Sequence, residues 1–433
     1  MNKPQFLIAA ANSGAGKTTV TLGLMRVLAK RNLSVQPFKC GPDYIDTKLH
    51  ALASGKPSVN LDLFLASPEH IENTYNKYTS SVDVSVVEGV MGLFDGYKKM
   101  EGSAAQIAKQ LDIPIVLVVN AKASAYSTAA LLYGFKNFDK DIRVKGVIFN
   151  FVGSESHYSF LKDACYDVGV EPLGYLPKDE NLAIPERHLG LDTDNTEAIH
   201  HSIDILSDAI EQHVDIERLL EITSSSVKST RVKEIETKPM FQCIAVAKDE
   251  AFNFMYVENI ETLQQLGSVV YFSPLHDKEL PREADFVYLP GGYPEFYASK
   301  LSENKTMHQS IYDYIEKGGK LFAECGGMMY LSSSIQTNEG VKYPMVDIFH
   351  QEASMKNMKL KLGYRLFSYQ GVEYRGHEFH YSQIISNLPS VAQQYGARGQ
   401  EVDTKLLRYK NAVAGYTHIY WADNENWLNL FND

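Results

Sequence analysis

Residues 11–19, ANSGAGKTT, constrain the fold of this chain more than any other segment. They follow the apolar run QFLIAA and precede TTVTLGLMRVLAKRN, which has the apolar period of an amphipathic helix. In a strand, glycine-rich loop and helix of this kind, backbone amides converge on phosphate oxygens and the helix N-terminus adds positive potential. The segment therefore predicts a nucleoside triphosphate site at the end of a strand in an α/β sheet.

The rest of the chain predicts two α/β domains. Short β-branched runs alternate with helical segments up to about residue 220, which indicates a doubly wound parallel sheet. The stretch ITSSSVKSTRVKEIETK that follows is polar and has no sustained apolar period, so we interpret it as a linker. A second alternating series then begins with FQCIAVAKD. We predict domains at residues 1–221 and 240–433, joined by a linker at 222–239.

Composition excludes several classes of protein. The net charge of −11 argues against a nucleic-acid groove. No apolar run reaches the roughly 20 residues of a membrane span, and the chain starts on a strand without a leader pattern, so we expect a cytoplasmic enzyme. The four cysteines are scattered without metal-binding spacing, which argues against a disulfide framework or a zinc site.

The phosphate loop departs from the strict Walker pattern, because Ala11 stands where that pattern has glycine. The alternative is an ordinary glycine-rich turn at a helix N-terminus that binds no nucleotide. The loop also resembles the variant loop of dethiobiotin synthetase and nitrogenase-iron-protein ATPases. We expect ATP to be bound by Ser13, Gly14, Ala15, Gly16, Lys17, Thr18 and Thr19, with Thr18 as a Mg²⁺ ligand.

Acidic side chains follow other strands of the predicted first sheet. Glu88 ends the run VSVVE, and Asp95 follows the glycine-rich turn after it. The segment FKCGPDYID places Asp43, Tyr44 and Asp46 beyond the second strand. Ligands of open α/β folds bind at the carboxyl ends of strands, and a carboxylate there can complete a Mg²⁺ shell beside Thr18. The alternative for each residue is a solvated turn.

A second site is predicted about 300 residues further on, in AECGG. Cys325 follows a strand and precedes two glycines, the sharp turn that presents a nucleophile. A thiol of ordinary pKa, about 8.5, needs a base, and His418 in AVAGYTHIYWAD is the best candidate. The amides of Gly292, in PGGYPE, and of Gly326 could bind the oxyanion. The acid that often follows such a base two positions later is absent, because that position is Tyr420.

Several longer motifs resemble one family over essentially the whole length. GPDYIDTKLH, VEGVMGLFDG, PERHLGL (185–191), AFNFMYVEN, FSPLHD, PGGYPE, AECGG and GHEFHYS lie in the order found in the cobyrinic acid a,c-diamide synthase family. The resemblance implies a P-loop ATPase domain joined to a class I glutamine amidotransferase domain. It also implies ATP- and glutamine-dependent amidation of tetrapyrrole carboxylates through acyl phosphates, with Mg²⁺, in cobalamin biosynthesis.

The resemblance also assigns roles to single residues. It implies that Asp43 and Glu88 are Mg²⁺ ligands and that Asn150 is a candidate adenine contact. Asn120 departs from the family's usual aspartate and is left unassigned. The substrate-end residues that it implies are Tyr44, Asp46 and Asp95.

Joining the two activities in one chain serves ammonia transfer. Ammonia is protonated in bulk water at neutral pH, so we expect the two sites to face each other across the domain interface or across a homodimer. Open alternatives are hydrogenobyrinate or nickel sirohydrochlorin as the tetrapyrrole, a different acceptor as in cytidine triphosphate synthesis, or a switch ATPase with a degenerate recognition module. His377 and His380 could suggest a metal, but a structural or domain-contact role is favoured.

Overall fold

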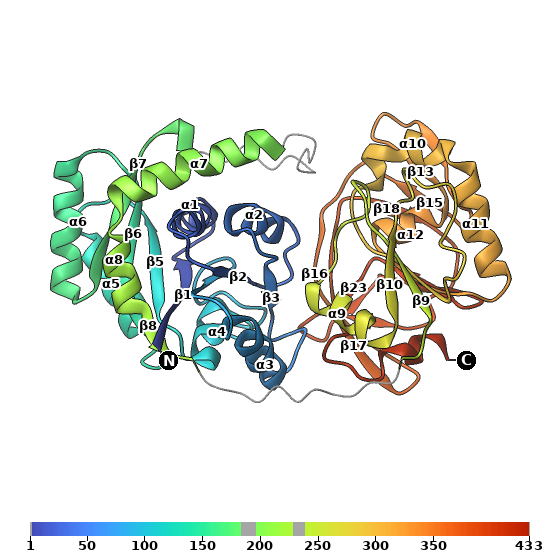
Figure 1. Ribbon diagram of the computed structural model, residues 1–433, viewed down its shortest axis with the longest axis horizontal. Coiled ribbons are helices and arrows are strands. Elements are labelled where there is room, and N and C mark those ends of the chain that lie inside the picture. Colours follow the sequence, from blue (N-terminus) through green and yellow to red (C-terminus); the bar gives the residue numbers. More distant parts are fainter. Residues whose placement is uncertain (1, 183–195, 228–238, 433) are drawn as a thin grey trace. The chain divides into compact units, whose positions relative to one another are not determined.

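The computed structural model describes residues 2–182, 196–227 and 239–432. They belong to two compact units, Met1–Lys233 and Glu234–Asp433 (Figure 1). This confirms the predicted class, in which a unit with a doubly wound parallel sheet is followed by a second α/β unit. The motif at 185–191 lies outside the described residues.

The N-terminal unit is built on a parallel sheet with the strand order β3-β2-β4-β1-β5-β6-β7. Each neighbouring pair along this order runs parallel. The strands are β1 (Asn2–Ala10), β2 (Val35–Cys40), β3 (Val59–Leu61), β4 (Val84–Glu88), β5 (Ile115–Asn120), β6 (Val144–Val152), β7 (Glu171–Pro177) and β8 (Ser224–Ser226).

Helices cover both faces of this sheet (Figure 1). The helices are α1 (Lys17–Lys30), α2 (Ile45–Ser54), α3 (Pro68–Thr79), α4 (Ala104–Leu111), α5 (Thr128–Asn137), α6 (Glu155–Val168), α7 (Thr196–His213) and α8 (Ile216–Thr223), with a 3-10 turn η1 (Glu180–Leu182). Helix α1 packs against α2 and α7, whereas α3 packs against α4.

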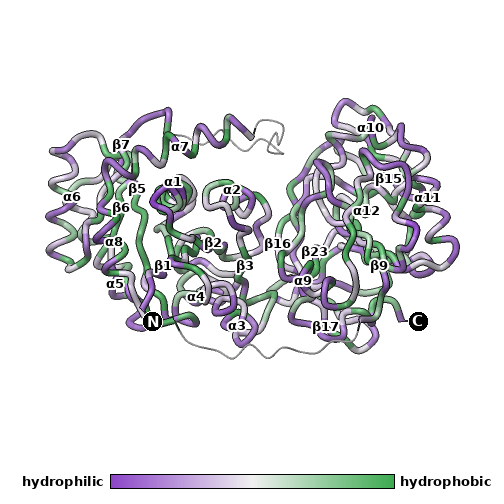
Figure 2. The backbone as a smooth tube through the Cα atoms, in the orientation of Figure 1, coloured by the Kyte–Doolittle hydropathy of each residue, from purple (hydrophilic) through white to green (hydrophobic). Residues whose placement is uncertain are grey.

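Local sequence explains where several of these helices begin. Ser67, Ser103 and Ser154 accept hydrogen bonds from the backbone amides three residues later, at the starts of α3, α4 and α6. A side-chain oxygen at this position satisfies an amide that has no partner inside the helix. The central strands carry the apolar residues, as the hydropathy colouring shows (Figure 2), and β1 and β4 are buried from Gln5 and Val84 onward.

The N-terminal unit continues beyond the boundary predicted at residue 221. Helix α8 runs to Thr223, and β8 then pairs antiparallel with the start of β1. The polar sequence SSS has no apolar period, which is why its composition predicts a linker, yet pairing with the first residues of β1 needs only backbone groups. The predicted linker therefore starts too early, and its residues 228–238 lie outside the described part of the chain.

The C-terminal unit has its own largely parallel sheet, with the order β10-β9-β11-β12-β22-β21. Only the β21–β22 pair in this order runs antiparallel. The elements are β9 (Cys243–Ala247), α9 (Val257–Leu266), β10 (Ser268–Phe272), β11 (Phe286–Leu289), η3 (Pro294–Tyr297), α10 (Ala298–Glu303), α11 (Lys305–Glu316), β12 (Lys320–Glu324), α12 (Gly326–Tyr330), β21 (Leu406–Tyr409), β22 (Ala412–Gly415) and η4 (Trp427–Phe431).

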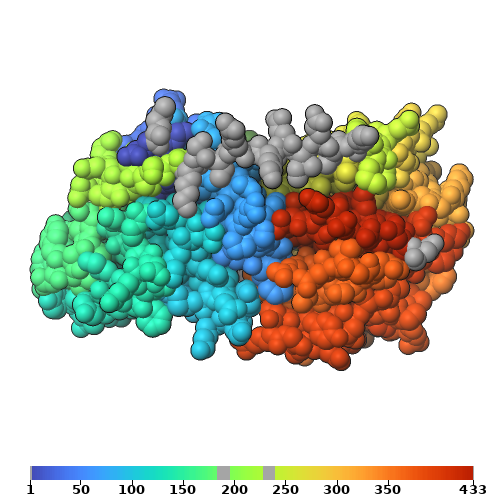
Figure 3. Space-filling view, turned by 90° about the horizontal axis from the view of Figure 1, so that it is seen from below, coloured from blue at the N-terminus to red at the C-terminus, as the bar shows by residue number. Residues whose placement is uncertain are grey.

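Two smaller sheets were not foreseen from the sequence. One has the order β14-β13-β15-β18, and the other, which is antiparallel, has the order β20-β19-β16-β17-β23. The segments drawn in orange and red lie side by side on one face of this unit (Figure 3), as the pairing of β17 with β23 requires. The strands are β13 (Ser332–Gln336), β14 (Lys342–Pro344), β15 (Phe349–Ser354), β16 (Lys361–Tyr369), β17 (Val372–His380), β18 (Gln383–Ile385), β19 (Gln394–Tyr395), β20 (Glu401–Val402) and β23 (His418–Ile419).

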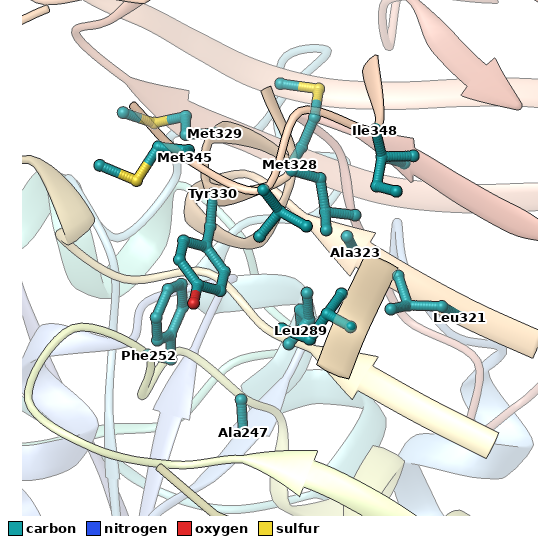
Figure 4. Close-up of a cluster of buried hydrophobic side chains, with 14 of the residues drawn as sticks. Ala247, Phe252, Leu289, Leu321, Ala323, Met328, Met329, Tyr330, Met345 and Ile348 are labelled. Carbon is teal, nitrogen blue, oxygen red and sulfur yellow. The ribbon is translucent and has the colours of Figure 1, made fainter. Parts of the chain in front are cut away.

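The core of the C-terminal unit surrounds the short helix α12. Met328, Met329 and Tyr330 of this helix are buried together with Leu289 and Phe252 (Figure 4). The rings of Phe252 and Tyr330 lie 5.4 Å apart. This packing fixes the turn that precedes α12. Within the described residues, no helix combines the length and apolarity that a bilayer crossing requires.

Candidate functional site

The phosphate loop joins β1 to α1 with two glycines in left-handed conformations. Gly14 has φ +78° and Gly16 has φ +90°. A Cβ on Gly16 would lie 2.0 Å from the Asn150 side-chain nitrogen, which donates a hydrogen bond of 3.1 Å to the Ala15 carbonyl. Ser13 is exposed and Ala15 is buried. Glycine is thus required at Gly16 both by the backbone conformation and by the close approach of β6.

Asn150, predicted as an adenine contact, is only 4% exposed at the end of β6. Its side-chain amide contacts the phosphate loop by donating a hydrogen bond to the Ala15 carbonyl. Asn120, on the neighbouring strand, is exposed and accepts a hydrogen bond of 3.0 Å from the Lys122 amide. In this structure both strand-end asparagines are bonded to backbone groups of nearby turns.

Lys17 opens α1, and its ammonium group donates to the carbonyl of Met91, in the loop after β4. Burial lowers the pKa of Lys17, while Glu88 opposes that change. Met91 is a non-glycine residue at φ +49° and is 44% exposed. Lys17 therefore ties the phosphate loop to a strained loop that already faces solvent.

Glu88 is the centre of a buried charged cluster at the carboxyl ends of β2 and β4. One carboxylate oxygen accepts from the Thr18 hydroxyl at 2.6 Å and from the Lys39 ammonium at 3.0 Å, and the other lies 2.6 Å from His50 Nε2. Burial alone would raise the pKa of Glu88, but the larger combined effect of Lys39 and His50 lowers it. Lys39 also pairs with Asp46 at 2.7 Å, and these carboxylates raise its pKa despite burial.

The oxygen donors fit a magnesium site that is completed by phosphate. Thr18 and Glu88 place a hydroxyl and a carboxylate 2.6 Å apart beside the phosphate loop. The described residues hold no group of three or more His, Cys, Asp or Glu side chains that could bind a metal by themselves. Mg²⁺ commonly uses one or two protein oxygens and takes its other ligands from substrate phosphates and water. Thr18 and Glu88 match that pattern.

Asp43 has a different role in the structure from that of Glu88. One of its oxygens accepts from the backbone amides of Ile45 and Asp46, at 2.8 and 2.7 Å. A carboxylate at a helix start stabilises the helix through such bonds. Asp43 therefore anchors the beginning of α2, and its second oxygen is the one left for a ligand.

The predicted substrate-end residues lie in different surroundings. Asp95 is exposed and accepts a hydrogen bond of 3.0 Å from the Gly92 amide. Tyr44 is half-buried at the start of α2, and Thr19 is half-buried in the first turn of α1. Asp46 is 3% exposed and paired with Lys39, so the structure joins it to the Glu88 cluster instead of presenting it to solvent.

Cys325 lies in a strained turn between β12 and α12. Its φ of 47° and ψ of −104° are unusual for a residue with a side chain, as in the turn that presents a nucleophile. The thiol is buried, and burial, followed by the charge of Glu295, raises its pKa well above the ordinary value. The resting thiol is therefore protonated, and a base must remove the proton before it can attack.

Gly292 and Gly326, predicted to bind the oxyanion, pack against each other. A Cβ on Gly326 would lie 3.0 Å from the Gly292 nitrogen and 2.8 Å from Pro294 Cδ. Both glycines thus lie at the Cys325 turn with no side chain between them. This arrangement fits two amides that serve one oxyanion.

His418 is buried at the start of β23, next to the same glycines. A Cβ on Gly291 would lie 2.2 Å from His418 Cε1 and 3.1 Å from its Nε2. The Cε1 edge of the imidazole therefore points at the backbone that leads into Gly292. Sequence reasoning missed Gly291, although its place in PGGYPE was a signal that a large group approaches the backbone there.

An acid near His418 was also missed by sequence reasoning. Glu324, the residue before Cys325, accepts a hydrogen bond of 2.7 Å from the Ile419 amide through one carboxylate oxygen. Its other oxygen accepts a hydrogen bond of 2.6 Å from the Tyr288 hydroxyl and lies 3.7 Å from His418 Nδ1. Tyr420, at the position where an acid was sought, packs its ring 5.3 Å from that of Tyr256.

The histidines of GHEFHYS belong to the antiparallel sheet. His380 Nε2 lies 2.6 Å from Glu378, its Nδ1 lies 2.8 Å from the Ser382 carbonyl, and its ring stacks 3.5 Å from Tyr416. Glu378 also pairs with Arg365, and its pKa falls to about 2: burial opposes the shift, and His380 and Arg365 cause it. Both ring nitrogens of His380 are thus engaged with protein groups, which fits the structural role favoured from the sequence.

Comparisons with known proteins agree with the two units. Residues 6–191 match the CobQ/CobB/MinD/ParA nucleotide binding domain, and residues 243–426 match the CobB/CobQ-like glutamine amidotransferase domain. The cobyrinate a,c-diamide synthase of Caldanaerobacter subterraneus is 42% identical over 96% of this chain and 94% of its own. That of Listeria innocua is 42% identical over 98% of this chain and 97% of its own.

Proposed function

The chain belongs to the cobyrinate a,c-diamide synthase family, and from that premise we propose which residues perform the two halves of its reaction. It is a glutamine-hydrolysing carbon–nitrogen ligase that couples nucleotide-driven activation of a carboxylate to ammonia from glutamine. Its acceptors are the a and c side-chain carboxylates of cobyrinate, the compound in the names of relatives that match over nearly the whole chain. The observation that carries the residue assignment is the strained Cys325 turn packed beside Gly292, with His418 on Gly291.

The N-terminal half activates the carboxylate. The loop amides of residues 13–16 and Lys17 hold the ATP phosphates, and Thr18 with Glu88 supplies protein oxygens for Mg²⁺. When bound, Mg²⁺ neutralises charge on the phosphate oxygens. A carboxylate oxygen of the acceptor attacks the γ-phosphorus, the bond to the ADP oxygen breaks, and an acyl phosphate results. Lys17 stabilises the charge that moves onto the departing oxygens.

The C-terminal half releases ammonia from glutamine. His418 takes the thiol proton, and the Cys325 sulfur attacks the carboxamide carbon of glutamine. The Gly292 and Gly326 amides bind the oxyanion of the tetrahedral intermediate. The proton returns from His418 to the leaving nitrogen, ammonia departs, and water hydrolyses the thioester. The buried, protonated thiol agrees with a nucleophile that is activated by its base during the reaction.

Ammonia and the acyl phosphate then combine. The ammonia nitrogen attacks the acyl carbon, and inorganic phosphate leaves with the oxygen that came from the carboxylate. We infer that this ammonia reaches the acyl phosphate before it is protonated in bulk water. Reaction in the presence of ¹⁵N-ammonium and unlabelled glutamine tests this: the amides should carry unlabelled nitrogen, and extensive labelling would refute direct transfer.

The decisive experiment separates the two halves. Cys325→Ser should lose glutamine-driven amidation but keep amidation with high ammonium at alkaline pH, whereas Lys17→Ala should lose both. Mass spectrometry of cobyrinate, hydrogenobyrinate and nickel sirohydrochlorin after incubation with ATP and glutamine identifies the acceptor. Absence of glutamine hydrolysis by the pure wild-type protein would instead favour the switch-ATPase alternative.

A further inference from the structure

We propose that Glu324 is the acid that positions His418 for catalysis, in place of the acid that class I glutaminases often carry two residues after the histidine. This inference deepens the proposed function and depends on it. Glu324 acts through His418 and does not contact glutamine, so we describe it as a positioning residue. The proposal is that one short segment, Glu324-Cys325, supplies both the nucleophile and the group that orients its base.

The first support is the burial of the Glu324 carboxylate. The residue is 1% exposed, and its two oxygens accept hydrogen bonds from the Ile419 amide and the Tyr288 hydroxyl. In the described part of the chain, no lysine or arginine forms an ion pair with it, and His418 is the group within 4 Å that can become a cation. A buried carboxylate without a cation is costly, so a histidine that gains charge during turnover is its natural partner.

The second support is that the Glu324 carboxylate contacts two consecutive residues of β23, His418 and Ile419. One oxygen is bound 2.7 Å from the Ile419 amide, and the other lies 3.7 Å from His418 Nδ1. The Ile419 bond fixes the backbone of β23, which limits where the His418 ring can lie. The Cε1 edge of that ring approaches the Gly291 backbone. The position of the His418 ring is therefore limited by both a carboxylate and a glycine.

The third support is the coupling of base and nucleophile through neighbouring strands. Glu324 ends β12 and is paired in register with Gly415 of β22, while the Cys325 amide donates a hydrogen bond of 2.7 Å to the Gly415 carbonyl. His418 follows three residues after Gly415. The sheet thus fixes the position of the Cys325 turn relative to the segment that leads into β23. The Glu324 side chain adds a direct contact to β23 through the Ile419 amide.

The chemistry follows from the orientation of the ring. A carboxylate beside Nδ1 favours the tautomer with hydrogen on Nδ1, in which the Nε2 lone pair can accept the thiol proton. The separation of 3.7 Å is longer than a hydrogen bond, so in the resting enzyme the interaction is Coulombic. When His418 becomes protonated, the negative carboxylate stabilises the imidazolium. The proton moves only between sulfur, His418 and the leaving nitrogen.

The test measures glutamine hydrolysis by full-length Glu324→Gln, which keeps the size and hydrogen-bonding oxygen but removes the charge. We expect kcat to fall about 100-fold while KM changes less than about threefold. This loss is smaller than the roughly 10⁴-fold effect of removing a hydrogen-bonded acid from a catalytic triad, because Glu324 lies 3.7 Å from His418 Nδ1. The acid limb of the pH profile should move to lower pH, because loss of a nearby negative charge disfavours the protonated imidazole. Amidation with ammonium should remain.

Two further variants separate positioning from structure. Asp285→Asn removes a carboxylate that also accepts backbone amides, those of Gln242 and Cys243, just before the amino end of β11. It should leave kcat and the pH profile unchanged. Glu324→Asp keeps the charge at a greater distance and should give a kcat between wild type and Glu324→Gln, which tests the proposal even if Glu324→Gln folds poorly.

The outcomes distinguish this proposal from the proposed function. Wild-type hydrolysis of glutamine with unchanged kcat and pH profile in folded Glu324→Gln would overturn the role of Glu324 alone. Equal losses in Glu324→Gln and Glu324→Asp, with a pH profile like that of wild type, would also overturn it and would indicate a packing role. No hydrolysis by wild type would overturn the proposed function itself.

Discussion

The two glycine-rich turns of this chain resemble each other in sequence but differ in the charge around them. The phosphate loop lies beside a cluster of Lys39, Asp46, Glu88 and His50 whose members are paired with one another. The thiol turn lies beside the carboxyl groups of Glu324 and Glu295 and the imidazole of His418. The surroundings of the first turn are therefore dominated by paired charges, and those of the second turn by burial.

This difference suits the two ligands. A triphosphate with Mg²⁺ brings its own charges, so a site that binds it must hold cations and anions in fixed places beforehand. Glutamine has a neutral carboxamide, and its hydrolysis needs a thiol that is shielded until a base removes its proton. In both sites a glycine lets a functional side chain approach the backbone: Asn150 at Gly16 and His418 at Gly291.

The largest effect should come from Gly16→Ala. Its Cβ would lie 2.0 Å from the Asn150 nitrogen, in addition to the strain at φ +90°. We expect amidation to fall by at least about 1000-fold with either glutamine or ammonium, because the phosphate loop must move. The matched variant Gly14→Ala has strain at φ +78° but nothing within 4 Å, and it should lose much less. Equal losses would show that backbone strain alone decides the effect.

Gly291→Ala should separate the two regions. A Cβ there would lie 2.2 Å from His418 Cε1, so the imidazole must shift. Glutamine hydrolysis should fall about 100-fold or more, since displacement of a catalytic group by about 1 Å has effects of this size. ATP-dependent amidation with ammonium should persist. Gly340→Ala, with φ +88° and nothing within 4 Å, is the control in the same unit; a comparable loss in this control would contradict the argument.

A smaller effect is expected from His50→Gln in the charged cluster. His50 Nε2 lies 2.6 Å from Glu88, and its Nδ1 lies 3.0 Å from the Ser58 hydroxyl. Loss of the imidazole should raise the half-saturating Mg²⁺ concentration about 10-fold, as is typical when a partner of a metal ligand is removed. Ser58→Ala should change it less. Titration of ATP-dependent amidation with Mg²⁺ measures both, and an unchanged Mg²⁺ requirement would show that Glu88 is positioned without His50.

The smallest effect concerns stability near the thiol. Burial raises the pKa of Glu295 to about 7 in the folded protein, from 4.5. Between these values the folded state binds more protons than the unfolded state, so stability falls as pH rises through this window. Glu295→Gln should therefore raise Tm by about 3 °C at pH 8 and by less at pH 5, measured by calorimetry. A larger gain at pH 5 would have the wrong sign.

The sequence predicted the fold because its signals were local. Apolar runs and the helical period after the phosphate loop predicted β1, α1, β2, β4, β9 and β12 near the places where the structure has them. The antiparallel strands β16 and β17 were missed, since their pairing depends on partners that no local period reports. The end of the first domain was missed for the same reason, because β8 is stabilised by a strand more than 200 residues away.

The candidate sites divide in the same way. Residues inside a motif, such as Lys17, Thr18, Cys325 and the glycines, could be named from spacing alone because the chemistry needs those residue types in that order. What the tertiary structure alone decided is which partners complete them. Glu88 meets Lys39 and His50, and Glu324 meets the His418 strand, through side chains that converge from separate strands and helices. A sequence specifies its local turns directly, but electrostatic partners are selected only when distant strands bring their ends together.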